Sequence, residues 1–311
     1  MIRTLSFLLC LLPAALAQDG TQIGGPVSGT VLDHGSGSLR PMLGVPGAAY
    51  LGAGLVAGVD AAAVSPDGEV ALAVSRGHLQ WISGLHELAP AGVPVDGAID
   101  GADRLAWSPD GSFAAAYSSR SGQAQVLRIA SRVPAAGPPI DIALPVTALA
   151  VSASGDLVAG AEGGVYLIAA GAAPRLLAAA ARPASLAVRG STLYVADSAA
   201  GSILRVDNFA TAAAASVFTD GVPSPVGVAL SSDGKRLLAA SRDGKFVGFW
   251  DLASGSPGGH VELDCVPTEL RAFGGRDIWL LNPDSVGTDP LYVATGGDQP
   301  AAWFVPAGRE Q

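Results

Sequence analysis

The chain is poor in cysteine and lysine, although it has 311 residues. Its two cysteines are Cys10 and Cys265, and we expect Cys10 to be removed with an N-terminal export signal, so that no intramolecular disulfide can form. Lys235 and Lys245 are the only lysines, and the net charge is −9. Because nucleic acids and anionic membranes favour dense Lys and Arg, this composition argues against both as partners.

Long apolar runs are missing too. The run from Leu5 to Leu12 is much shorter than the roughly 20 residues that span a bilayer, so we expect no membrane insertion. With Met1-Ile2-Arg3 before it and Ala15-Leu16-Ala17 after it, the run completes a secretory signal. We expect cleavage before Gln18 to release a soluble, monomeric protein, secreted or periplasmic, whose net charge becomes −10 because Arg3 is lost.

Local motifs for catalytic and metal sites are also absent. No H-x-x-x-H pair, calcium loop or G-x-S-x-G elbow occurs, and Cys265 lacks a nucleophile signature. Residues 52–57 satisfy G-x-G-x-x-A, but a strand rather than a helix is expected after them, so we interpret them as a loop. We expect His78 and His260 to have packing or surface roles. We therefore predict no catalytic residue, no cofactor and no metal.

What the chain contains is a repeat built on tight turns. Ala61–Val74 reads as an apolar run, Ser-Pro-Asp-Gly and a second apolar run, and Arg104–Tyr117 and Val228–Ala240 follow the same pattern. Successive turn glycines, at 68, 111, 155, 190, 234 and 275, are 43, 44, 35, 44 and 41 residues apart. This period fits four short strands with their turns, which is one propeller blade.

The repeat predicts an all-β fold, a single β-propeller of six full four-stranded blades. The expected organisation is a signal peptide (1–17), an N-terminal hairpin with a connecting loop (18–59), six repeats (60–306) and a C-terminal tail (307–311). The hairpin matches the third and fourth strands of a blade, and whether it makes an incomplete seventh blade or caps the ring stays open. Helix is a competing interpretation for the alanine-rich segments 178–181 and 212–215.

Several repeats resemble known propeller families. The Ser-Pro-Asp-Gly turns at 65–68 and 108–111 resemble the WD40-like repeats of TolB-type periplasmic propellers, and 192–203 looks like an NHL or YVTN-type repeat. Phe249-Trp250-Asp251 is similar to the end of a WD40 strand, but the histidine that partners Asp in a WD40 blade is missing. The resemblance implies an exported bacterial propeller, commonly a binding platform and sometimes an enzyme.

Charged residues gather at one set of predicted connections. The turns between the second and third strands of each blade, and the connections into each first strand, are expected to share the face at the channel mouth. The candidate binding residues there are Arg76, Arg120, Glu162, Asp197, Arg242, Asp284, Asp60 and Asp103. Arginines can hold a carboxylate or phosphate bidentately, while the competing interpretation is that they pair with neighbouring acids and solvate the rim.

The sequence thus favours a non-enzymatic scaffold whose loops bind a protein or a small anionic ligand. A propeller enzyme, such as a lactonase-like hydrolase or a lyase, is the alternative, because such enzymes collect acids and histidines from several blades without a local motif. A structural module of the cell surface is a third class.

Overall fold

The structure is a computed structural model, and it describes residues 26–87, 89–273, 277–283, 290–296 and 300–306. These residues form strands and turns, and none of them is helical. No helix in this part of the chain therefore has the length and apolar character needed to cross a membrane. The helical interpretation of the alanine-rich segments is wrong, because they lie in or beside the strands β17 (Arg175–Ala178) and β21 (Ala214–Thr219).

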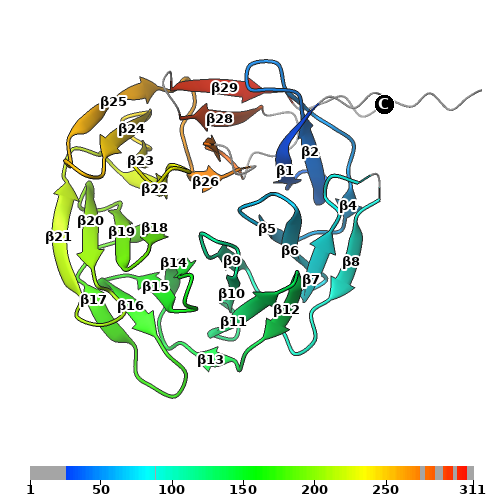
Figure 1. Ribbon diagram of the computed structural model, residues 1–311, viewed down its shortest axis with the longest axis horizontal. Coiled ribbons are helices and arrows are strands. Elements are labelled where there is room, and N and C mark those ends of the chain that lie inside the picture. Colours follow the sequence, from blue (N-terminus) through cyan, green and yellow to red (C-terminus); the bar gives the residue numbers. More distant parts are fainter. Residues whose placement is uncertain (1–25, 88, 274–276, 284–289, 297–299, 307–311) are drawn as a thin grey trace, which may run out of the picture.

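Seven antiparallel sheets stand around a central axis like the blades of a propeller (Figure 1). The expected six blades plus a hairpin is therefore wrong, because the N-terminal hairpin is the inner part of a sheet of its own. We number the sheets as blades 1 to 7 in chain order. Within blades 2 to 7 the first strand of each sheet lies nearest the axis and later strands follow outward.

Blades 2 to 4 consist of the following strands. Blade 2 contains β5 (Ala61–Val64), β6 (Val70–Ser75), β7 (His78–Ser83) and β8 (Ala91–Pro94). Blade 3 contains β9 (Arg104–Trp107), β10 (Phe113–Ser118), β11 (Gln123–Ala130), β12 (Val133–Ala136) and β13 (Ile140–Asp141), the last two both pairing with β11. Blade 4 contains β14 (Val146–Val151), β15 (Leu157–Ala161), β16 (Gly164–Ile168) and β17.

Blades 5 to 7 complete the repeats. Blade 5 contains β18 (Pro183–Arg189), β19 (Thr192–Asp197), β20 (Ser202–Asp207) and β21. Blade 6 contains β22 (Pro225–Leu230), β23 (Arg236–Ser241), β24 (Phe246–Asp251) and β25 (Pro257–Glu262). Blade 7 contains β26 (Arg271–Ala272), β27 (Ile278–Leu280), β28 (Leu291–Thr295) and β29 (Ala301–Val305).

The Ser-Pro-Asp-Gly turns join the first and second strands of blades 2 and 3, as expected. The Gly68 N–H donates to Ser65 O at 2.9 Å, and the Gly111 N–H donates to Ser108 O at 3.0 Å. Both glycines have positive φ, 78° and 72°, which a residue with a side chain rarely adopts. The Ser108 hydroxyl accepts from the Phe113 N–H at 2.9 Å and donates to Asp110 at 2.7 Å, so the turn closes on its own side chains.

Blade 1 departs from the repeat. It contains β1 (Val27–Asp33) and β2 (Ser38–Leu43), and two short strands, β3 (Tyr50–Leu51) and β4 (Val56–Ala57), both pair with the outer edge of β2. Of residues 52–57, expected to be a loop, residues 52–55 are the break between β3 and β4, and only Val56 and Ala57 form a strand. The hairpin is not the outer pair of strands, because β3 and β4 lie outside it.

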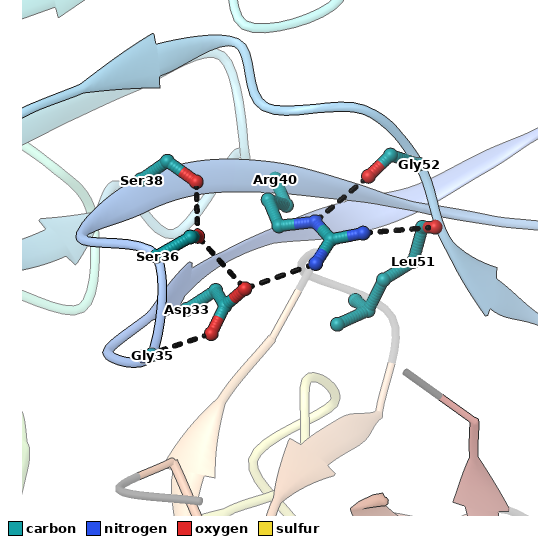
Figure 2. Close-up of polar contacts among 7 residues, drawn as sticks. All are labelled: Asp33, Gly35, Ser36, Ser38, Arg40, Leu51 and Gly52. Atoms are coloured by element: carbon teal, nitrogen blue, oxygen red, sulfur yellow. Dashed lines mark hydrogen bonds and ion pairs between the residues drawn. The ribbon is translucent and has the colours of Figure 1, made fainter. Parts of the chain in front are cut away.

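A buried arginine fills the break between β3 and β4 (Figure 2). Arg40 Nε donates to Gly52 O at 2.8 Å, and its guanidinium also reaches Leu51 O at 3.4 Å. A third contact joins Arg40 Nη1 to the Asp33 carboxylate at 2.9 Å. The side chains of Arg40 and Asp33 are only 9% and 12% exposed. The guanidinium thus supplies donors to carbonyl groups where the strand ladder is interrupted.

The hydrophobic core is divided among the seven contacts between neighbouring blades. Seven clusters of buried side chains are present in the described residues, and each joins two adjacent blades. The cluster that closes the ring packs Val31 and Met42 of blade 1 against Val293 and Val305 of blade 7. No described strand is shared between the first and last blades, so the ring is closed by apolar side-chain packing.

Candidate functional site

The turns between second and third strands meet the connections into the first strands on one face, which we call the loop face. In blade 6, the Arg242 N–H donates to Ser224 O at 3.1 Å. In blade 3, the Asp103 N–H donates to Tyr117 O at 2.9 Å. These bonds hold the backbone of the loop face in place. The opposite face carries the turns between first and second strands and between third and fourth strands, and we call it the turn face.

Asp197 holds two segments of the loop face together in blade 5. This residue is 2% exposed, and its carboxylate accepts hydrogen bonds from the Ala181 N–H at 2.6 Å and the Arg182 N–H at 3.0 Å. The N–H groups of Ala199 and Ala200 donate to the same carboxylate at 3.2 Å. Because four backbone donors already surround it, this side chain orders the connection into β18, and little of it is exposed to a ligand.

Asp60 and Asp103 stand directly before the innermost strands of blades 2 and 3, at the end of these strands where the channel mouth is expected. Asp103 precedes β9, and its carboxylate accepts from the N–H and hydroxyl of Ser119. Asp60 precedes β5, is exposed, and its N–H donates to Val74 O at 2.8 Å. Of these two carboxylates, only that of Asp60 carries no hydrogen bond to a described residue.

Arg76, Arg120, Arg242 and Glu162 are exposed on the turns between second and third strands. Within the described ranges, none of the three guanidinium groups makes a hydrogen bond or an ion pair of 4.0 Å or shorter. The competing interpretation, that these arginines pair with neighbouring acids, is therefore not what the described residues show. Asp284, the remaining candidate, lies outside the described residues.

The candidate residues are spread over the loop face and do not converge. The arginines belong to blade 2, blade 3 and blade 6, and no described hydrogen bond or ion pair joins one candidate side chain to another. Strands in a sheet lie about 4.8 Å apart, so a turn between the second and third strands sits more than one strand spacing outward from the innermost strand. The arginines thus surround the mouth at a distance, while Asp60 and Asp103 border it.

Three further arginines lie beside the mouth and were not predicted. Arg104 opens β9 and Arg182 directly precedes β18, and both are exposed. Arg271 opens β26, and its guanidinium binds Glu269 through two contacts of 3.1 and 2.7 Å. The signal for them was the phase of the repeat, since each stands at or just before a first strand.

The described residues offer no cluster of metal ligands, and the free thiol of Cys265 is not activated. They contain no group of three or more His, Cys, Asp or Glu side chains able to hold a metal ion. Burial raises the pKa of the Cys265 thiol to about 11, so it is protonated at neutral pH. His78 contacts Asp100 at 2.9 Å with both side chains exposed, and His260 packs on Phe246 with ring centroids 5.5 Å apart.

Comparison with known proteins identifies the fold alone. No family model matches the chain, and none of the curated proteins matches it. Among solved structures, it is similar to the periplasmic gluconolactonase of Pseudomonas aeruginosa, with 17% identity, a TM-score of 0.62, and coverage of 91% of this chain and 97% of that one. It is also similar to hydrazine synthase of Kuenenia stuttgartiensis, with 15% identity, a TM-score of 0.54 and coverage of 76% of each chain.

Proposed function

We propose that this seven-bladed propeller is an exported, non-enzymatic platform that binds an anionic group of a protein or small molecule on its loop face. The observation that supports it is the state of Arg76, Arg120 and Arg242, which are exposed and without an ion pair among the described residues. A guanidinium without a partner keeps its donors for a carboxylate or phosphate.

The rigidity of the loop face favours the same function. Backbone hydrogen bonds fix the turns that carry these arginines, as for Arg242 and Ser224. Ordering a loop costs free energy when it binds, and a turn that is already held avoids much of that cost. The arginines therefore need to lose little more than side-chain freedom.

The overall charge sets the range over which binding acts. The chain carries a net charge of −9, so an anion is repelled at long distance and attracted only near the arginines. Salt screens exposed charges beyond about 10 Å at 0.1 M ionic strength. We expect binding to depend on direct contact with guanidinium groups rather than on long-range steering.

The test compares the chain from Gln18 with its triple variant Arg76→Ala, Arg120→Ala and Arg242→Ala. The probe is a fluorescein-labelled hexaglutamate peptide, measured by fluorescence anisotropy. Loss of the arginines should weaken binding at least about tenfold, since one charge-assisted contact contributes roughly 1.4 kcal/mol or more. The control is Arg128→Ala, which removes an exposed arginine of β11 and should leave affinity unchanged. Equal binding by the triple variant, or no binding by the parent chain, would refute the proposal.

A hydrolase is the second candidate, favoured by the likeness to a gluconolactonase over most of both chains. At 17% identity this likeness concerns the fold, so the reaction must be measured on this chain. Asp60 is the residue to change, because its carboxylate borders the mouth and has no hydrogen bond among the described residues. Hydrolysis of gluconolactone that is lost in Asp60→Asn would support the enzyme. Turnover no faster than the uncatalysed reaction would refute the hydrolase and leave the binding platform as the proposed function.

A further inference from the structure

A cavity of about 340 Å³ opens on the turn face between blades 2 and 3. Its apolar lining comprises Val70, Trp81, Trp107 and Ile129, and its rim carries the two Ser-Pro-Asp-Gly turns and Arg132. The volume is at the lower end of the range for small-molecule sites, roughly 300 to 1,000 Å³. Nothing in the platform proposed for the loop face uses this cavity, which lies on the opposite face.

Two tryptophans give the cavity an aromatic wall. The rings of Trp81 and Trp107 lie with centroids 5.9 Å apart and planes inclined by 54°. Trp107 Nε1 donates to Ala63 O at 2.9 Å, which fixes the second ring across the boundary between the blades. Its indole donor is therefore satisfied by the protein. Trp81 is only 4% exposed, so the apolar and π surface that the wall offers a ligand comes mainly from Trp107, with Trp81 behind it.

Two bridges between the blades frame the opening. On one side the Gly111 turn lies against Pro66, where a Cβ added at Gly111 would be 3.8 Å from the proline Cδ. On the other side Arg132 Nη1 reaches Glu69 Oε2 at 3.5 Å. Ser131 and Arg132, with φ of 50° and 60°, are the two central residues of the tight hairpin turn between β11 and β12, where positive φ suits the twist of the strands.

The rim is more negative than positive. Asp67, Glu69 and Asp110 line it or its bridge, against the single cation Arg132, which already faces Glu69. Among contacts of the described residues, Asp67 uses only Oδ1, toward Ser65 and the Glu69 N–H, so Oδ2 stays available. An anion would be repelled by this excess of carboxylates, and a neutral apolar ligand would leave Asp67 Oδ2 without a partner.

We propose that this cavity binds a small organic cation, an aryl- or alkylammonium, with its apolar body against the tryptophans and its ammonium group at Asp67 and Glu69. Aromatic faces attract cations through the ring quadrupole, and carboxylates at the same opening add charge-assisted hydrogen bonds. The site is separate from the loop face, so this proposal does not depend on the platform function.

Three probes of matched size test the charge preference on the unaltered chain. They are phenethylammonium, 2-phenylethanol and 3-phenylpropionate, each titrated against tryptophan fluorescence and checked by calorimetry. We expect the cation to bind at least about tenfold more tightly than the alcohol, and the carboxylate to bind more weakly than both. Equal affinities for all three probes, or no response to any of them, would refute the proposal without recourse to a variant.

Asp67→Asn locates the ammonium group. The change keeps an acceptor for the turn but removes the charge, so the preference for the cation over the alcohol should fall about tenfold. Asp233→Asn is the matched control, because Asp233 accepts from Ser231 Oγ and the Lys235 N–H in the same turn of blade 6. An unchanged preference in Asp67→Asn, or the same loss in Asp233→Asn, would overturn the assignment of the site.

Discussion

Blade 1 and blade 2 reach a paired sheet by different means. In blade 2, β7 pairs with β8 over four consecutive residue pairs, and the turn into β6 is closed by Ser65. In blade 1 the strand outside β2 is broken after two residues, and the Arg40 guanidinium binds the carbonyls at the break. One blade is held by regular backbone hydrogen bonds between its strands, and the other is held partly by a single side chain.

The difference explains where the stability of each blade is concentrated. A ladder spreads its hydrogen bonds over many residues, so losing one of them costs little. Arg40 concentrates three roles in one buried cation, joining Gly52, Leu51 and Asp33. Removing one partner of a buried charged pair is more costly than removing a surface pair, because the other charge is left without compensation.

The largest expected effect is that of Arg40→Ala. It leaves the carbonyls of Leu51 and Gly52 without their hydrogen-bond donor and Asp33 without its cation. We therefore expect a loss of about 3 to 5 kcal/mol in the free energy of unfolding. The measurement is urea unfolding followed by tryptophan fluorescence. Blade 1 also closes the ring through Val31 and Met42, so the loss should be global rather than confined to one blade.

Arg128→Ala is the control for this prediction. Arg128 is exposed on β11, and its side chain makes no hydrogen bond or ion pair within the described ranges. Its removal should change the unfolding free energy by no more than about 0.5 kcal/mol. If Arg40→Ala were as mild as Arg128→Ala, the guanidinium would not be what holds the outer tier of blade 1.

A smaller effect is expected for Ser65→Ala in blade 2. The hydroxyl is buried and accepts from the Val70 N–H at 3.2 Å, so its removal leaves one backbone donor unpaired. We expect a loss of about 1 to 2 kcal/mol, measured in the same unfolding experiment. A loss as large as that of Arg40→Ala would show that blade 2 also depends on a single side chain, and the contrast between the blades would fail.

This contrast also shows how far the sequence predicts the fold. The repeat of apolar runs and Gly turns correctly predicts the strands on either side of the Ser-Pro-Asp-Gly turns, β5 with β6 and β9 with β10, because backbone pairing needs regular spacing. Blade 1 was not predicted as a full blade because its outer tier, at β3 and β4, is only two residues long on each side of the break. A side chain that replaces ladder bonds leaves no periodic signal.

The candidate site was predictable only as a set of connections. The phase of the repeat gives the turns that carry Arg76, Arg120 and Arg242, but not the partners of their side chains. Burial of Asp197 under four backbone N–H groups depends on how two segments of blade 5 meet, which spacing does not reveal. The cavity beside Trp81 and Trp107 likewise arises from the packing of two blades.

The smallest expected effect is on the acid side of the stability profile, and it sharpens the role of blade 1. Burial acts to raise the pKa of Asp33, but hydrogen bonds from Arg40 and Ser36 outweigh it and hold the pKa below its ordinary value. A carboxyl whose pKa is lower in the folded state stabilises it above the ordinary value, about 3.9, and this contribution disappears as the pH falls through the folded-state pKa.

Asp33→Asn should therefore flatten the loss of stability below about pH 4, and change the slope little between pH 5 and 8. The flattening should be partial, because hydrogen bonds also lower the pKa of Asp110 in blade 3 against the effect of its burial. The measurement is thermal unfolding at a series of pH values for the parent chain, Asp33→Asn and Asp110→Asn. If the stability of the parent chain and of Asp33→Asn fell equally steeply below about pH 4, Asp33 would contribute nothing to holding Arg40. The carbonyls of Leu51 and Gly52 alone would then hold it.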